Sequence, residues 1–182
     1  MPDAALDLSS AHLIHHGELQ ANTWRNYVPE EGAAADAAAA VAVPADEPGW
    51  IVPLATWKAA RDVLRARRHP VGVQLPPDTD LADLLGGDAD TLDTTGIALI
   101  AVEFPAYTDG RGYSLAQLLR TRYGYTGELR AVGDVMIDTI HYQARVGFDS
   151  FLVKPGHDPH KALAAFKTFS VHYQKTYLVP AA

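Results

Sequence analysis

Apolar and polar positions from residue 50 onward follow two periods in turn, one typical of strands and one typical of helices. Short, continuously apolar runs predict strands, because a strand buried on both faces has no polar alternation. Apolar residues three and four positions apart predict helices between these runs. The predicted strands are 50–54, 71–75, 97–102, 128–132 and 149–153, and the predicted helices are 57–68, 81–85, 114–123, 135–146 and 159–173.

Residues that favour helix termini set the boundaries of these helices. Thr56 is a candidate N-cap for the first helix, and Ser114 opens a capping box with Gln117. Asp158 precedes Pro159, which is well tolerated at the first position of a helix. Among the apolar residues, we expect Val63 and Leu118 to face inward.

Strands that alternate with helices predict a parallel arrangement with right-handed crossovers. An eightfold barrel typically needs about 250 residues, so the units present are too few for one. We therefore expect an α/β fold with a mostly parallel sheet, open or shaped like an incomplete (β/α) barrel. Exposed edge strands of such a sheet could be covered by dimerisation or by an N-terminal β-ribbon.

The first 49 residues differ from the rest. Residues 1–29 contain a short apolar patch followed by Gly17, which predicts a ribbon turning at that glycine. Residues 30–49 are rich in alanine and proline and contain no large apolar stripe, so we interpret them as a loop. Residues 50–182 form the predicted α/β domain, to which residues 176–179 could add an edge strand. We expect a single domain overall.

Composition narrows the function classes. The 182 residues carry a formal net charge of −7 and contain no cysteine. Disulfides, thiol nucleophiles and cysteine-ligated metals are thereby excluded. The acidic balance argues against nucleic-acid binding. No apolar run approaches the roughly 20 residues of a membrane helix, and residues 1–10 lack the basic residues of a secretory signal. We expect a soluble, cytoplasmic protein.

Charge is unevenly distributed along the chain. The segment 57–69 carries five Lys and Arg residues, whereas 76–96 carries six aspartates and no base. Either segment could be ordinary solvated surface. Alternatively, the basic segment could dock an acidic partner or the acidic segment of a second copy.

The carboxyl ends of parallel strands are where α/β proteins place their sites. This rule selects Gln74, Glu103, Asp134 and Lys154. Glu103, Asp134 and Lys154 are candidate catalytic residues, because carboxylates can hold a hard cation or move a proton and a lysine can act as a base. Helix capping by Asp134 and a surface ion pair of Lys154 are the structural alternatives. The pattern defines no metal ligand set and no cofactor.

The loop at residues 108–114 is a candidate anion or ligand site. Its glycines permit close backbone approach, and its amides lead into a helix N-terminus, which favours anions. A guanidinium adds a planar fork that suits oxyanions. The candidate binding residues are Asp109, Gly110, Arg111, Gly112 and Ser114, with Arg130 on the following strand. The alternative is a tight turn in which Asp109 and Arg111 stabilise each other.

Residues 97–153 resemble a bacterial family known as domain of unknown function 934. The matching segments are Glu-Phe-Pro at 103–105, Thr-Asp-Gly-Arg-Gly-Tyr-Ser at 108–114, Leu-Leu-Arg at 118–120, Tyr-Gly-Tyr-Thr-Gly-Glu-Leu-Arg-Ala-Val-Gly-Asp-Val at 123–135 and Gly-Phe-Asp at 147–149. Thr139 and Val146 depart from the family pattern, where an amide and a cysteine are common. A thiol at position 146 is therefore not required for the family's role.

The resemblance implies a link to sulfite assimilation. Family members are commonly encoded beside assimilatory sulfite reductase and carry an oxidoreductase label from that neighbourhood, which is an association rather than a mechanism. Without cysteine or a dinucleotide fingerprint, an accessory protein that binds the reductase, a small oxyanion or a cofactor fits the residues better. A small-molecule enzyme and a non-catalytic assembly subunit, for example a homodimer, stay open as alternatives.

Overall fold

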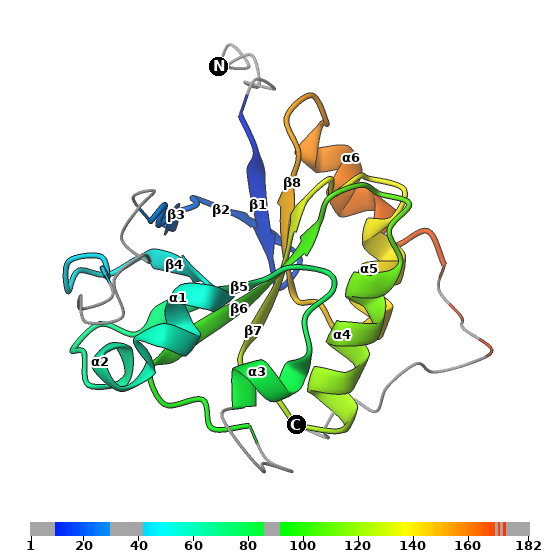
Figure 1. Ribbon diagram of the computed structural model, residues 1–182. Coiled ribbons are helices and arrows are strands. Elements are labelled where there is room, and N and C mark those ends of the chain that lie inside the picture. The colour runs from blue at the N-terminus through cyan, green and yellow to red at the C-terminus, as the bar shows by residue number, and fades with distance from the viewer. Residues whose placement is uncertain (1–9, 30–41, 86–91, 170, 172, 174–182) are drawn as a thin grey trace.

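The structure, a computed structural model, describes residues 10–29, 42–85, 92–169, 171 and 173. In these residues eight strands form one sheet, in the order β2-β1-β8-β7-β6-β5-β4-β3. Strands β3 to β8 run parallel, and β1 lies antiparallel to both β8 and β2 (Figure 1). The strands are β1 (His12–His15), β2 (Glu18–Gln20), β3 (Arg25–Asn26), β4 (Trp50–Pro53), β5 (Val71–Leu75), β6 (Ile97–Phe104), β7 (Glu128–Gly133) and β8 (Ser150–Val153).

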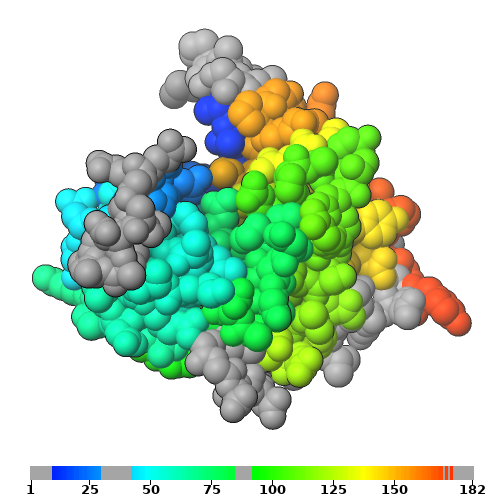
Figure 2. Space-filling model, in the orientation of Figure 1, coloured from blue at the N-terminus to red at the C-terminus, as the bar shows by residue number. Residues whose placement is uncertain are grey.

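Helices follow the parallel strands and pack on one face of the sheet. They are α1 (Leu54–Ala59), α2 (Arg61–Arg65), α3 (Leu81–Leu85), α4 (Arg111–Thr121), α5 (Ile140–Val146) and α6 (Pro159–Ala165). Figure 2 shows the surface that side chains from the α1 to α4 part of the chain form over this face. None of the described helices has the length and apolar character needed to cross a membrane. The predicted α/β fold with a mostly parallel sheet is confirmed.

The sheet is curled into a half-barrel, as the short connection between its two edge strands requires. Strands β2 and β3 are the two edges of the sheet, yet only residues 21–24 connect them. Seven inter-strand steps of about 4.8 Å would separate the edges of a flat sheet by about 34 Å. Five extended Cα–Cα steps span at most about 18 Å. The edges must therefore bend toward each other, which leaves one convex face under the helices and one concave face.

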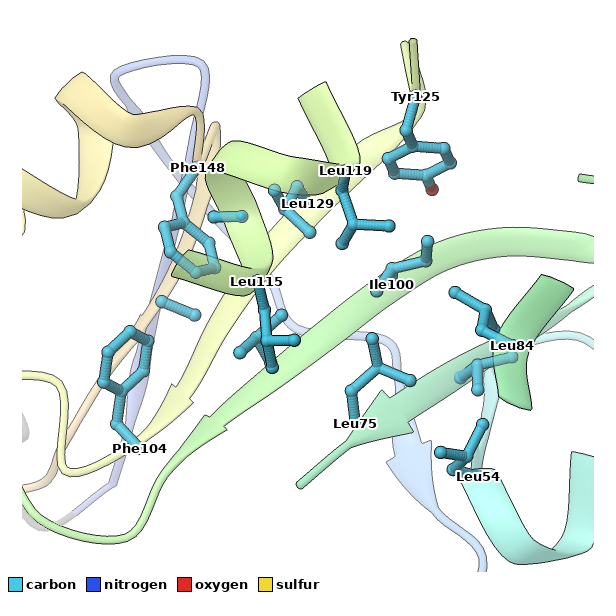
Figure 3. Close-up of a cluster of buried hydrophobic side chains, with 14 of the residues drawn as sticks. Leu54, Leu75, Leu84, Ile100, Phe104, Leu115, Leu119, Tyr125, Leu129 and Phe148 are labelled. Carbon is cyan, nitrogen blue, oxygen red and sulfur yellow. The ribbon is translucent and has the colours of Figure 1, made fainter. Parts of the chain in front are cut away.

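The main core lies between the convex face and the helices (Figure 3). Strand residues Leu75, Ile100 and Leu129 point into it and meet Leu115 and Leu119 of α4, all of them buried. Fully burying a side chain of this size contributes roughly 1.5–3 kcal/mol. The apolar runs that predicted buried strands therefore supply the sheet side of this core, and the helices supply the other side.

The predicted N-terminal ribbon is confirmed. Strands β1 and β2 form a hairpin whose turn contains His16 and Gly17, both with positive φ. The ribbon pairs with β8 and so covers an edge that the parallel strands would leave open. The predicted strand at 176–179 lies outside the described residues, as does most of the loop predicted at 30–49.

Four predicted helices differ in their boundaries. The helix expected at 57–68 is two helices, α1 and α2, that meet at Ala60. The first of them starts at Leu54, directly after β4 ends at Pro53, whose nitrogen has no hydrogen to donate to the sheet. Thr56 is thus not an N-cap but a buried residue inside α1, and Val63 is exposed rather than inward. The last predicted helix, at 159–173, is α6 and ends at Ala165. Its predicted cap by Asp158 is confirmed, since the Asp158 carboxylate accepts from the His160 amide.

The other two differences concern α4 and α5. Helix α4 starts at Arg111, so Ser114 is an exposed residue of its first turns and not the predicted cap, and Leu118 is 41% exposed. Helix α5 starts at Ile140 rather than 135, because the Val135 carbonyl accepts from the Lys154 amide and the Val135 amide donates to Gly133. Because the Val135 carbonyl is already bound to Lys154, it does not accept the hydrogen bond that a helix starting at 135 would require.

Within the described ranges, three of the five Lys and Arg side chains of the basic segment 57–69 form ion pairs with carboxylates of this same chain. Lys58 pairs with Asp83 at 2.8 Å, and Arg65 pairs with Asp93 at 3.0 Å. Arg67 and His69 both contact Asp46. Two of these carboxylates, Asp83 and Asp93, belong to the acidic segment 76–96 of the same chain. Docking on a separate partner or on a second copy stays a prediction.

Candidate functional site

Polar side chains from three adjacent strands gather on the concave face. Gln74 lies on β5, Glu103 on β6 and Arg130 on β7. Successive side chains of a strand point to opposite faces, and the neighbours Leu75, Val102 and Leu129 belong to the convex-side core. The three polar residues therefore share the concave face, where a second, smaller apolar cluster of Ile51, Leu99 and Ala101 lies.

These residues line a pocket of about 290 Å³. Its polar lining consists of Asn22, Asn26, Gln74, Glu103 and Arg130, and its other walls are Trp24, Ile51, Val132, Gly133 and Leu152. Asn22 and Trp24 belong to the connection between β2 and β3, which thus closes the concave face on one side. The pocket combines a carboxylate, a guanidinium, amides and an indole within one small volume.

Arg130 is held rigidly at the wall of this pocket. It is only 2% exposed, and its Nε and Nη2 atoms donate to Glu128 Oε1 at 2.9 and 2.6 Å. Nε also contacts Ser150 Oγ at 3.1 Å, and Nη1 donates to Asn22 Oδ1 at 3.3 Å. The positive charge of Arg130 is therefore balanced by Glu128. The hydrogen bond from Nη1 to Asn22 is the longest of the four that the Arg130 side chain makes in the described part of the chain.

Glu103 has a different environment. Its Oε2 accepts a hydrogen bond from Gln74 Nε2 at 3.1 Å, and the side chain is partly buried. Within the described residues, no Lys, Arg or His side chain forms an ion pair with Glu103. A carboxylate in a pocket without a cationic partner can accept a proton or a donor group from a bound molecule.

Asp134 and Lys154 form a separate pair after β7 and β8. Lys154 Nζ lies 2.5 Å from Asp134 Oδ1, while Asp134 Oδ2 accepts from the Tyr107 amide at 2.8 Å. The Lys154 hydrogen bond, supported by the Tyr107 amide, holds the pKa of the Asp134 carboxyl below its usual value. Asp134 does not cap α5, because the N-cap of that helix is Thr139. Neither residue lines the concave pocket, so the structure joins Asp134 with Lys154 but not with Glu103.

The 108–114 loop is organised by its own charges. Asp109 accepts from Arg111 Nη2 at 2.6 Å, from its Nε at 3.0 Å and from its backbone amide at 3.1 Å. The Arg111 hydrogen bond lowers the pKa of the Asp109 carboxyl. The side chain of Arg111 is still 57% exposed. Because α4 covers the convex face and Arg130 lies on the concave face, the loop and Arg130 do not form one site.

The two glycines of this loop have different roles. A Cβ at Gly112 would lie 2.7 Å from the ring of Phe104, so this glycine lets α4 pack closely on β6. A Cβ at Gly110 would meet no heavy atom within 4 Å, and its φ of −80° is open to other residues. The requirement for glycine at 112 is thus explained by packing, and the structure gives no such reason at 110.

Sequence reasoning did not identify the N-terminal part of the pocket. Asn22 contacts Arg130 across 108 residues of chain, and no local pattern signals such a contact. Glu128 was likewise not recognised as the partner of Arg130, although their spacing of two residues along a strand places them on one face. In the described part of the chain, no group of three or more His, Asp or Glu side chains is arranged to hold a metal ion.

Comparison with known proteins supports the resemblance seen in the motifs. No curated protein matches the chain. The family described as bacterial protein of unknown function (DUF934) matches residues 72–182, which include β5 to β8 and with them Gln74, Glu103 and Arg130 of the pocket. The match spans more than half of the chain, and the protein therefore belongs to this bacterial family, DUF934.

Proposed function

We propose that this protein is an accessory protein of assimilatory sulfite reduction that binds a small molecule in its concave pocket. The observation that carries the binding role is the convergence of Gln74, Glu103 and Arg130, from three adjacent strands, on one pocket. The pathway rests on what the family resemblance implies. Together they suggest a protein that carries or senses a small ligand for the reductase.

The size of the pocket favours a small metabolite. Its volume of about 290 Å³ is at the lower end of the range for ligand pockets. A dinucleotide cofactor is a larger ligand, and the chain has neither a dinucleotide fingerprint nor a cysteine. The features of the pocket therefore support a binding role more than an independent oxidoreductase.

The 108–114 loop is the proposed contact with the reductase. A small free oxyanion would have to displace Asp109 from Arg111, whereas an acidic protein surface can approach the exposed side of the guanidinium. Tyr107, which is 50% exposed, lies beside this loop and adds an aromatic contact of the kind enriched in interfaces. Association with sulfite reductase, like the homodimer, stays a prediction.

A growth experiment tests the proposed pathway. A deletion strain is grown with sulfate, sulfite or sulfide as the only sulfur source, and complemented with the wild-type chain. Growth restored by sulfide but not by sulfate or sulfite is expected, because only sulfide bypasses the reductase. Equal growth of the deletion strain on all three sources would remove the link to sulfite reduction.

A small-molecule enzyme that uses Glu103, Asp134 and Lys154 is the second candidate. The close Asp134–Lys154 pair at the strand ends favours it, since such pairs occur in proton-transfer sites. However, Lys154 Nζ and Asp134 Oδ1 already bind each other at 2.5 Å, so this pair must separate before either group can act on a substrate. Failure of Lys154→Arg to complement growth, with unchanged thermal stability, would favour the enzyme.

A purely structural subunit is the third candidate. In that hypothesis the basic segment would bind the acidic segment of another copy. The contacts of Lys58 with Asp83 and of Arg65 with Asp93 already join these segments within one chain. The described ion pairs therefore give this candidate less support than the pocket gives to ligand binding.

A further inference from the structure

The charges around the concave pocket do not balance, and this imbalance defines what the pocket can bind. Arg130 is neutralised by Glu128, whose Oε1 receives two of its donors. Glu103 has the amide of Gln74 as a partner but no cation among the described residues. The pocket therefore presents one uncompensated negative charge at Glu103.

We infer that the pocket binds a small amino compound whose ammonium group contacts the Glu103 carboxylate. This inference rests on the proposed role of the pocket as a ligand site and names its ligand class. A ligand that replaces water around a carboxylate must supply positive charge or strong donors, because an unpaired charge is costly to desolvate. An ammonium supplies both, with three donors.

Two neighbours of Glu103 fit the same ligand. The Gln74 side chain fixes one carboxylate oxygen, so the carboxylate is oriented before the ligand arrives. Trp24 lines the pocket, and indole is the aromatic ring that attracts cations most strongly. The connection that carries Trp24 thus adds a favourable wall for an ammonium.

The other end of the ligand faces Arg130. Arg130 lies opposite Ala101 in the sheet, two residues before Glu103, which places the two Cα atoms about 8 Å apart from ordinary strand spacings. Within the described part of the chain, Nη1 of Arg130 makes one hydrogen bond, the 3.3 Å contact with Asn22, so its second hydrogen can be donated to an oxygen of the ligand. Both side chains extend from these positions and line one pocket of about 290 Å³, so the ligand that we infer is a small molecule with an ammonium at one end and an oxygen acceptor at the other.

The same charges disfavour a free oxyanion in this pocket. Sulfite would be repelled by Glu103 and carries no ammonium group to offset that repulsion, so a contact with Nη1 of Arg130 is all that the pocket offers it. The ligand of the pocket is therefore distinct from the anion that the reductase consumes.

Titration of the ¹⁵N-labelled full chain by NMR tests the inference. The probes are L-serine, ethanolamine and sulfite, each added at millimolar concentration. The side-chain amides of Asn22, Asn26 and Gln74 and the Trp24 indole report on the pocket directly. L-Serine is expected to shift these resonances most, because its carboxylate reaches Arg130, ethanolamine less, and sulfite not at all.

Glu103→Gln separates the charge from the shape of the pocket. This variant keeps the volume and a hydrogen-bonding group, and we expect it to bind L-serine at least about tenfold more weakly. Glu18→Gln is the matched control, because it removes the same charge from the exposed strand β2, outside the pocket. Unchanged thermal unfolding of both variants shows that they fold.

Three results would overturn the inference: no binding of either amine, binding of sulfite in their place, or equal L-serine binding by Glu103→Gln. None of them affects the growth experiment, so the ligand class can fail while the pathway stands. Equally, a deletion strain that grows on all sulfur sources would remove the pathway and leave amine binding intact.

Discussion

At the scale of single residues, the charged side chains of the candidate sites differ in whether they form an ion pair with another side chain of the protein. Arg111 has Asp109, Lys154 has Asp134 and Arg130 has Glu128. Glu103 contacts only a neutral amide among the described residues. A ligand that binds a paired charge must compete with the existing partner, whereas Glu103 has no ionic partner among the described residues. This difference distinguishes Glu103 from the other candidate residues.

The Asp134–Lys154 pair is expected to make stability depend on pH in the acid range. A carboxyl whose pKa is lower in the folded state contributes stability above its unfolded pKa and loses it as the pH falls through the folded pKa. Lys154→Met is therefore expected to lower the free energy of unfolding at pH 7 by up to about 1 kcal/mol, since the pair is partly exposed. The difference from wild type should vanish well below the ordinary pKa of 3.8.

Urea unfolding of both proteins across this pH range checks the prediction. Lys161→Met, on the exposed side of α6, is the control and should follow the wild type at every pH. A stability difference for Lys154→Met that persists at low pH would mean that its aliphatic packing, not the ion pair, is responsible.

Arg111→Ala is expected to abolish complementation of the deletion strain while leaving the melting temperature nearly unchanged. The side chain is 57% exposed and its described partner, Asp109, lies only two residues away, so it links no distant elements. Growth on sulfate and a thermal melt of the purified variant are the two measurements. A melting temperature lowered by many degrees would show that Arg111 is a structural clamp instead.

At the scale of the elements, α4 is fixed to the sheet at both ends. At its start, Gly112 allows close packing on Phe104. At its end, Arg120 donates to the carbonyls of Tyr125, Gly127 and Gly147 and pairs with Asp149 at 2.9 Å. These contacts join the helix to the strands on either side of it and so set the position of the loop that precedes it.

Arg120→Met is expected to destabilise the fold by roughly 3 kcal/mol. The Arg120 side chain is only 8% exposed, and its loss leaves buried carbonyls and a carboxylate without their donors. Arg122→Met is the matched control: Arg122 is exposed and lies over the ring of Tyr123, so its loss should cost far less. Chemical denaturation of the two variants gives the comparison, and equal stability would contradict the clamp.

At the scale of the whole molecule, the curl of the sheet creates the pocket. The short connection of residues 21–24 brings the two edge strands toward each other and places Asn22 and Trp24 over the concave face. The candidate pocket thus depends on the first part of the chain, although the family match begins only at residue 72.

Deletion of residues 33–42 is expected to leave the fold intact. Residues 33–41 lie outside the described residues, and the prediction rests on the sequence of 33–42, which consists of eight alanines, Asp36 and Val41 and has no stripe of large apolar side chains. Circular dichroism and thermal unfolding of the purified deletion variant should match the wild type. Deletion of residues 12–21, of equal length but containing β1, should prevent folding. Loss of soluble protein from the first variant would contradict the loop assignment.

The sequence alone was sufficient for the class of fold, because strand burial is encoded locally. The apolar runs at 71–75 and 97–102 coincide with β5 and with most of β6, and the helices between them required parallel strands. Helix boundaries were less predictable. Thr56 and Ser114 have good capping chemistry, but Pro53 and the packing of Gly112 on Phe104 decided where α1 and α4 begin.

The candidate site divides in the same way. The rule of strand ends selected Glu103, Asp134 and Lys154 from the sequence, since chain order fixes which residues follow each strand. Only the tertiary structure decided that Glu103 faces the concave pocket with Gln74 and Arg130, whereas Asp134 pairs with Lys154 outside it. The physical reason is that side-chain partners depend on the pleat, the curl and contacts across 108 residues, such as Arg130 with Asn22, which no local pattern contains.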